Sequence, residues 1–107
     1  YPNLNVGDYN YTLDTNEMLI DQNYPNPFNS KTAINYTLNR DLMIDITVYD
    51  ISGRKVKTLL NKWQIKGDYK IKWDANGQKG EDLPSGMYFY QLKTENFVKN
   101  KRMILLK

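Results

Sequence analysis

The sequence contains no cysteine and no histidine among its 107 residues. Without cysteine the chain can form neither a disulfide nor a zinc site built on thiolates. Without histidine it lacks the usual general base and the most common ligand of transition metals. Its only serines, Ser30, Ser52 and Ser85, all fall in predicted turns. We therefore expect no catalytic residue, no metal site and no cofactor, and we predict that the chain is not an enzyme.

Long apolar runs are also missing. No stretch approaches the roughly 20 residues that a membrane-spanning helix requires, and the longest candidate, Met103–Leu106, is typical of one end of a strand. The chain begins at Tyr1 without a charged and then apolar leader, so we expect it to be a piece of a longer protein. Its hydrophobic fraction of 40% and mean hydropathy of −0.72 fit one small domain.

Charge is unevenly distributed within a modest net charge of +3. Residues 1–53 carry two basic and seven acidic side chains, whereas residues 54–107 carry thirteen basic and five acidic ones. The basic half would suit an anionic partner such as a nucleic acid. However, pairs of lysines two residues apart, such as Lys70 and Lys72, are typical of the solvated face of a strand. No nucleic-acid-binding motif accompanies them, so we expect no nucleic-acid partner.

Alternating apolar and polar residues predict an all-β fold. The pattern predicts a series of strands joined by short antiparallel connections, and it leaves two short segments near the N-terminus open as added strands. Such a series is typical of a small immunoglobulin-like antiparallel β-sandwich of about six to eight strands. In chain order the expected strands are 32–38, 43–50, 55–60, 69–73, 86–94 and 97–106, with 9–13 and 18–20 left open.

Three of these strands carry further information. The strand 69–73 alternates with lysines, so Trp73 is expected to point into the core. The segment 86–94 is apolar on both faces, which predicts a central strand. The last strand carries Lys99 and Lys101 in its middle, which predicts a protected sheet edge.

Two weaker patterns favour a structural interpretation. The loop 74–82 is rich in the oxygen ligands that calcium prefers, but a lysine lies in its middle. We expect a long turn in which Gly77 and Gly80 take positive φ, with calcium binding left open. The aromatic residues could form a sugar-stacking face, but only Trp63 is expected to be exposed, so we favour packing in the core.

The most distinctive segment is residues 22–32, where Pro25 and Pro27 stand among asparagines. Each proline biases its preceding residue away from helix, and the asparagines favour turns. Apolar alternation begins directly afterwards, at Ile34. The sequence therefore predicts a rigid polar and aromatic segment that leads into the first long strand.

Several motifs follow one another along the chain. They are Gln22, Asn23, Tyr24, Pro25, Asn26, Pro27, Phe28 and Asn29; Val48, Tyr49, Asp50, Gly53 and Val56; Trp73 and Asp74; Ser85–Tyr90; and Lys101–Lys107. In this order and spacing the chain resembles a type A C-terminal sorting domain of the type IX (Por) secretion system of Bacteroidetes. The resemblance implies a sorting domain over residues 19–107. Residues 1–18 are then expected to be a linker or the end of a preceding module.

The resemblance implies a β-sandwich that acts as a non-catalytic address. Such a domain directs a larger parent protein, which lies upstream, across the outer membrane. The implied partners are the outer-membrane type IX translocation apparatus and a sortase-like peptidase. The parent would pass through the periplasm and be secreted or held at the cell surface, which is compatible with peripheral association with the outer membrane. The alternative left open is a retained module that binds a carbohydrate, a neighbouring subunit or a filament.

Within this resemblance we expect three groups of functional residues. A recognition group lies on the last strand and its neighbour, where a partner could add a strand to an exposed edge. An entry group orients the domain relative to its cargo, and a structural group maintains the fold. The recognition group is Gly86, Tyr88, Tyr90, Lys101, Arg102, Met103, Leu105 and Lys107. The entry group is Asn23, Pro25, Asn26, Pro27, Phe28 and Asn29, and the structural group is Gly53, Trp73 and Asp74.

Overall fold

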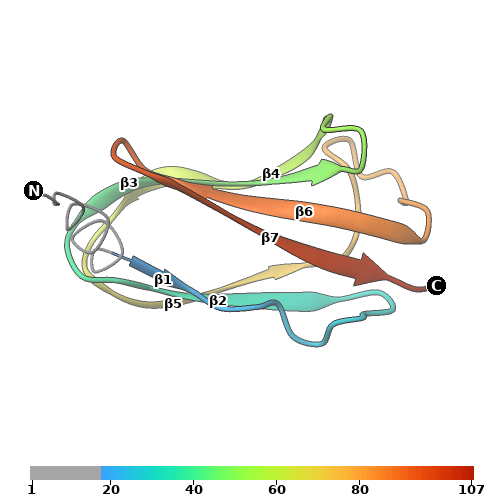
Figure 1. Cartoon of the computed structure of the whole chain (residues 1–107), viewed down its shortest axis with the longest axis horizontal. Coiled ribbons are helices and arrows are strands. Elements are labelled where there is room, and N and C mark those ends of the chain that lie inside the picture. Colours follow the sequence, from blue (N-terminus) through green and yellow to red (C-terminus); the bar gives the residue numbers. More distant parts are fainter. Residues whose placement is uncertain (1–17) are drawn as a thin grey trace, which may run out of the picture.

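The computed structural model describes residues 18–107. They form two antiparallel sheets packed face to face, which confirms the predicted β-sandwich (Figure 1). The lower sheet in Figure 1 has the strand order β1-β2-β5, and the upper sheet has the order β4-β3-β6-β7. The strands are β1 Met18–Ile20, β2 Thr32–Leu38, β3 Leu42–Asp50, β4 Lys55–Gln64, β5 Gly67–Trp73, β6 Gly86–Lys93 and β7 Val98–Leu105.

Most strand bounds agree with the alternation pattern, and β1 lies where a short strand was left open. The segment 9–13 lies outside the described residues. Strand β4 extends past its predicted end at residue 60 because it pairs with all of β3, starting with Leu42 opposite Gln64. Strand β5 begins two residues before its predicted start at residue 69, because Gly67 and Asp68 pair with the end of β2. No helix in residues 18–107 has the length and apolar character needed to cross a membrane.

The core lies between the sheets and is filled by one face of each strand. Trp73 at the end of β5 is 1% exposed, as its alternation with lysines predicted, whereas Trp63 on β4 is 60% exposed, also as predicted. The ring of Trp73 contacts those of Phe28 and Tyr88, with centroids 5.8 and 6.0 Å away. Other fully buried side chains are those of Met18, Ile34, Leu38, Ile44, Ile46, Val48, Tyr90, Leu92, Met103 and Leu105.

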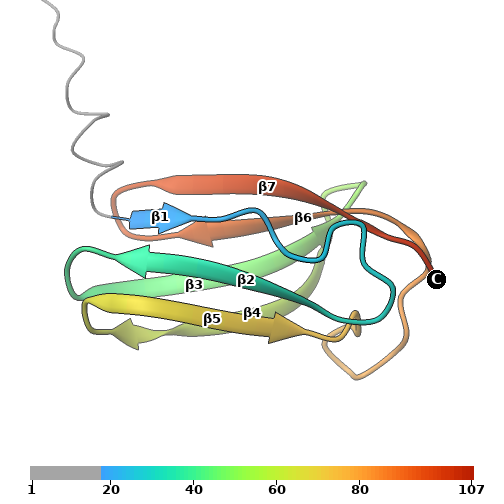
Figure 2. The same ribbon diagram turned by 90° about the horizontal axis from the view of Figure 1, so that it is seen from below.

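The order of strands in the upper sheet confirms two further predictions. Strand β6 lies between β3 and β7, so it is central, and β7 forms one edge. The ladder between β6 and β7 runs without interruption from Gly86 opposite Leu105 to Lys93 opposite Val98. Figure 2 shows β7 at one side of the molecule, with β1 of the other sheet beside it. The two sheets therefore meet along this side at β1 and β7.

The turn between β3 and β4 is organised by Asp50. Its Oδ1 accepts hydrogen bonds from the Ser52 hydroxyl at 2.7 Å and from the backbone N–H groups of Ser52 and Arg54, both at 3.0 Å. The bond from the Ser52 hydroxyl, followed by the one from the Arg54 N–H, holds the pKa of Asp50 below its usual value. Gly53 occupies this turn with φ 87°, a conformation that glycine adopts without steric cost.

The loop 74–82 differs from prediction at one glycine. Gly80 has φ 83°, as expected, but Gly77 does not adopt positive φ, and Ala75 does so instead, with φ 61°. A Cβ atom at Gly77 would overlap the carboxylate of Glu81, so a larger residue at this position would displace the end of that exposed side chain. The same two residues are also joined by a hydrogen bond from the Gly77 N–H to the Glu81 carbonyl, at 2.9 Å.

Candidate functional site

Residues 21–31, here called the entry segment, run along the side where β1 and β7 meet (Figure 2). The first part of the segment continues the lower sheet beside β2. The Asp21 N–H donates to the Asn35 carbonyl at 2.9 Å, and Tyr24 and Ala33 exchange two backbone hydrogen bonds of 2.9 and 3.0 Å. This part therefore adds to the free edge of β2.

The second part of the entry segment crosses to the upper sheet and pairs with β7. The Phe28 N–H donates to the Ile104 carbonyl at 2.9 Å, and the Leu106 N–H donates to the Phe28 carbonyl at 2.8 Å. The Asn26 side chain accepts a hydrogen bond from the Ile104 N–H at 2.9 Å. One short segment therefore joins the edges of both sheets, and we call this set of contacts the clasp.

Tyr90 of β6 fixes the entry segment from inside the core. Its hydroxyl donates to the Asp21 carbonyl at 2.7 Å and accepts from the Asn23 N–H at 2.8 Å. Burial raises the pKa of Tyr90 to about 12. The Asn23 side chain in turn donates to the Thr32 hydroxyl at 2.9 Å and to the Pro25 carbonyl at 3.1 Å. The start of the segment is therefore tied both to the core and to its own turn.

The end of the entry segment is anchored by packing. Phe28 is 2% exposed, and its ring meets that of Trp73 at an interplanar angle of 52°. Pro25 and Pro27, which both follow cis peptide bonds, lie on the exposed side of the segment. The two exposed prolines thus lie between the buried Asn23 and the buried Phe28.

The predicted recognition group divides into core and surface residues. Gly86, Arg102 and Lys107 are exposed, and Lys101 is half-buried. The remaining four, Tyr88, Tyr90, Met103 and Leu105, are at most 4% exposed. The side chains of these four cannot contact a partner in the folded domain, because the opposite sheet covers them. Their position in the core is explained by the alternation of β6 and β7.

The expected exposed edge also needs correction. The backbone of β7 near its C-terminal end is not free, because the entry segment bonds to Ile104 and Leu106. The prediction that the end of the last strand is open for strand addition is therefore wrong for this stretch. Local sequence patterns do not reveal this pairing, since Asn26 and Ile104 lie 78 positions apart.

One exposed residue of each group, Asn26 of the entry group and Arg102 of the recognition group, lines a shared groove. It has a volume of about 310 Å³ and includes residues from both ends of the chain. Its lining residues are Gln22, Asn26, Met87, Arg102 and Ile104. Among the structural group, Gly53 and Asp74 are exposed and Trp73 is buried. The structure thus brings together the two motifs that stand farthest apart in the sequence.

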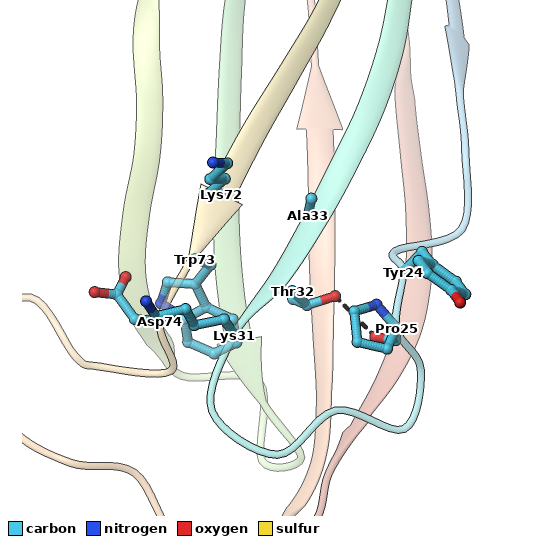
Figure 3. Close-up of a pocket in the computed structure, with 8 residues that line it drawn as sticks. All are labelled: Tyr24, Pro25, Lys31, Thr32, Ala33, Lys72, Trp73 and Asp74. Atoms are coloured by element: carbon cyan, nitrogen blue, oxygen red, sulfur yellow. Dashed lines mark hydrogen bonds between the residues drawn. The ribbon is translucent and has the colours of Figure 1, made fainter.

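A second pocket lies on the other side of the entry segment (Figure 3). It has a volume of about 390 Å³, and sequence reasoning did not single it out. Figure 3 shows Lys31 and Asp74 near the Trp73 ring at one end and Tyr24 at the other. The residues that line it are Tyr24, Pro25, Lys31, Thr32, Ala33, Lys72, Trp73 and Asp74. In residues 18–107 no group of three or more acidic side chains is arranged to hold a metal ion.

Solved structures that share this fold include three bacterial proteins. Dimeric latent PorU from Porphyromonas gingivalis matches 83% of this chain at 24% identity, with a TM-score of 0.68, over 9% of its own length. PorZ from the same organism, an essential surface component of its type IX secretion system, matches 86% at 19% identity and TM-score 0.55, over 12% of its length. FLGD from P. aeruginosa matches 69% at 21% identity and TM-score 0.54, over 58% of its length.

These similarities establish a shared fold, and the chain spans only a small part of PorU and PorZ. A comparison with curated proteins found no match. The family models give a direct assignment, since the model of the secretion system C-terminal sorting domain matches residues 22–106, from the entry segment to the end of β7. The chain belongs to the family of secretion system C-terminal sorting domains.

Proposed function

We propose that this domain is a non-catalytic sorting signal that directs a larger parent protein across the outer membrane by type IX secretion. The family match over residues 22–106 carries the proposal. It is supported by the similar fold of PorZ, which is itself described as a component of such a system. In this proposal residues 19–107, together with Met18 of β1, form the sorting domain, and the residues before Met18 are a linker or the end of a preceding module.

The clasp gives this proposal a physical basis. The entry segment and the end of β7 form the shared groove only after both sheets have folded, because Phe28 and Tyr90 anchor the segment in the core. A partner that contacts this groove would therefore recognise the folded domain. We propose that the outer-membrane translocation apparatus recognises Asn26 and Arg102, which line the groove, and the exposed Lys107, which follows Leu106 of the clasp.

The proposed partners act in sequence. The translocation apparatus would bind the folded domain in the periplasm, and a sortase-like peptidase would then separate it from the cargo. The parent protein would finish outside the cell, either released or held at the surface. The hydroxyls of two of the three serines form hydrogen bonds within the fold, which supports a structural role for these serines. The Ser52 hydroxyl donates to Asp50, and the Ser85 hydroxyl accepts from the Lys107 N–H.

Fusion of residues 1–107 to a secreted reporter tests the proposal in a bacterium with a type IX system. Deleting residues 101–107 would be ambiguous, because it removes the buried Met103 and Leu105. A sharper variant combines Arg102→Glu with Lys107→Glu, both exposed.

The matched control combines Lys62→Glu with Lys66→Glu, which makes the same charge change at exposed positions near the opposite edge. We expect extracellular reporter for the intact domain and the control, and periplasmic reporter for the groove variant. Reporter that stays inside the cell with the intact domain would contradict the sorting function. Equal export of both double variants would contradict only the placement of the recognition surface.

A further inference from the structure

Only some of the backbone N–H and C=O groups that β7 points away from its sheet form hydrogen bonds. In an antiparallel edge strand, every second residue points its N–H and C=O away from the sheet. Ile104 is such a residue, because its N–H and C=O bond to Asn26 and Phe28 of the entry segment, both at 2.9 Å. Two positions earlier, the Arg102 carbonyl accepts a hydrogen bond from the Gln22 side chain at 2.6 Å. The clasp therefore covers β7 from the Arg102 carbonyl onward.

The preceding half of β7 is open. The ladder with β6 has no register shift, so Asn100 and Val98 also point their backbone groups outward. In the described part of the chain, these outward groups have no hydrogen-bond partner beyond the sheet. Val98 is 46% exposed and Asn100 is exposed as well. Residues 98–102, here called the open half-edge, thus present unpaired donors and acceptors to solvent.

The charge of the open half-edge selects its partner. Within these five residues Lys99, Lys101 and Arg102 are cationic and none is acidic, and Lys93 of β6 lies opposite Val98. Lysines on an edge strand oppose pairing with another basic strand. A second copy of β7 would bring the same cations into register and be repelled. An acidic strand would instead gain both backbone hydrogen bonds and charge complementarity.

The opposite edge of the same sheet, formed by β4, is less suited to the addition of an acidic strand. Gln78 of the loop 74–82 covers part of β4, where its N–H donates to the Val56 carbonyl at 3.0 Å and its side chain accepts from the Thr58 N–H at 2.9 Å. Strand β4 also spreads its three lysines over the ten residues Lys55–Gln64. Its density of positive charge is therefore about half that of the open half-edge.

We propose that the open half-edge binds a short, extended, acidic peptide segment of a partner protein by strand addition. The added strand would pair with the outward groups of Val98 and Asn100 and place carboxylates near Lys99 and Lys101, which lie on the same face of β7. Because the clasp ends the free edge at Arg102, the partner strand can extend the sheet over only about five residues. The inference rests on the proposed function and gives the chemistry of one contact that a sorting partner makes.

Two synthetic peptides of eight residues test the proposal, one alternating valine with glutamate and the other alternating valine with lysine. Each is titrated into the ¹⁵N-labelled domain, and backbone amide shifts and hydrogen exchange are recorded. We expect the acidic peptide alone to shift and protect the Val98 and Asn100 amides, with affinity that falls as salt increases.

Backbone pairing is tested by Asn100→Pro, which removes one outward N–H at a position where an edge strand tolerates proline. Asn100→Thr is the matched control because it keeps that N–H. Thermal midpoints verify that both variants fold. We expect Asn100→Pro to bind the acidic peptide about tenfold more weakly, corresponding to one lost hydrogen bond of roughly 1.4 kcal/mol, and Asn100→Thr to bind as wild type.

Several results would overturn this inference. They are absence of binding by the acidic peptide, equal binding of both peptides, shifts confined to β4 or β5, or unchanged binding by Asn100→Pro. Self-association of the free domain through Val98 and Asn100 would assign the edge to a second copy and also overturn it. The reporter assay distinguishes a failure of this inference from a failure of the proposed function. Export of the reporter without peptide binding would overturn only the inference. Peptide binding without export would contradict the sorting function.

Discussion

The buried hydroxyl of Tyr90 should make a large contribution to the stability of the clasp. Tyr90→Phe keeps the ring but removes the hydrogen bonds to Asp21 and Asn23, of 2.7 and 2.8 Å. The Asn23 N–H would then be buried without a partner, which typically costs about 1–3 kcal/mol, whereas the Asp21 carbonyl is partly accessible to water. We expect the free energy of unfolding to fall by about 2–4 kcal/mol, a large part of the total for a small domain.

Tyr88→Phe provides the matched control in the same strand. In the wild type, the Tyr88 hydroxyl donates one partly buried hydrogen bond, to the Pro84 carbonyl at 2.7 Å. The expected loss is about 1 kcal/mol. Urea denaturation of the three proteins at pH 7, followed by tryptophan fluorescence, measures both changes. A loss below about 0.5 kcal/mol for Tyr90→Phe, or a larger loss for Tyr88→Phe, would refute the argument.

The same residue predicts a pH dependence. The pKa of Tyr90 is about 12 in the folded domain, against roughly 10 in the unfolded chain. A raised pKa gives stability that is fully present below pH 10 and is lost as the pH rises towards 12. The difference in stability between wild type and Tyr90→Phe should therefore shrink by about 1.4 kcal/mol at pH 11. A difference that stays constant from pH 7 to pH 11 would contradict this burial of the hydroxyl.

Three further substitutions probe the clasp and the 74–82 loop, with unfolding free energies measured as above. Phe28→Ala should cost about 3–5 kcal/mol, because it leaves a cavity at a side chain that is 2% exposed; a cost below 1 kcal/mol would argue against anchoring. Asn26→Ala should cost about 1 kcal/mol and speed amide exchange at Ile104, its hydrogen-bond donor; unchanged exchange would speak against this bond. Gly77→Ala should cost less than about 1 kcal/mol, because the added methyl group meets only the carboxylate end of the exposed Glu81 side chain, which can swing away; a loss above about 2 kcal/mol would show that this side chain is held in place.

The sheet architecture was largely predictable from alternation. A period of two places one face of each strand in the core, so the burial of Trp73 and the exposure of Trp63 followed from local sequence. The lengths of β4 and β5 were less predictable, because the partner strand determines where pairing ends. Glycine is typical of turns, for example, yet Gly67 lies in β5 and pairs with Leu38 of β2.

The candidate site was only half predictable. Its two motifs stand out by composition and by the family resemblance, but their contact depends on long-range hydrogen bonds such as Asn26 to Ile104. The role of Tyr90 was missed for the same reason, since its partner Asn23 lies 67 positions away. Alternation identifies Tyr90 as inward-facing, but it does not show which polar group its hydroxyl meets.

Removal of residues 19–107 from the natural parent protein, followed by quantification of the parent in periplasmic and extracellular fractions, tests the sorting function most directly. If the domain directs sorting, the truncated parent collects in the periplasm, while the full-length protein reaches the outside. Equal amounts of both proteins outside the cell would show that this domain is dispensable for export.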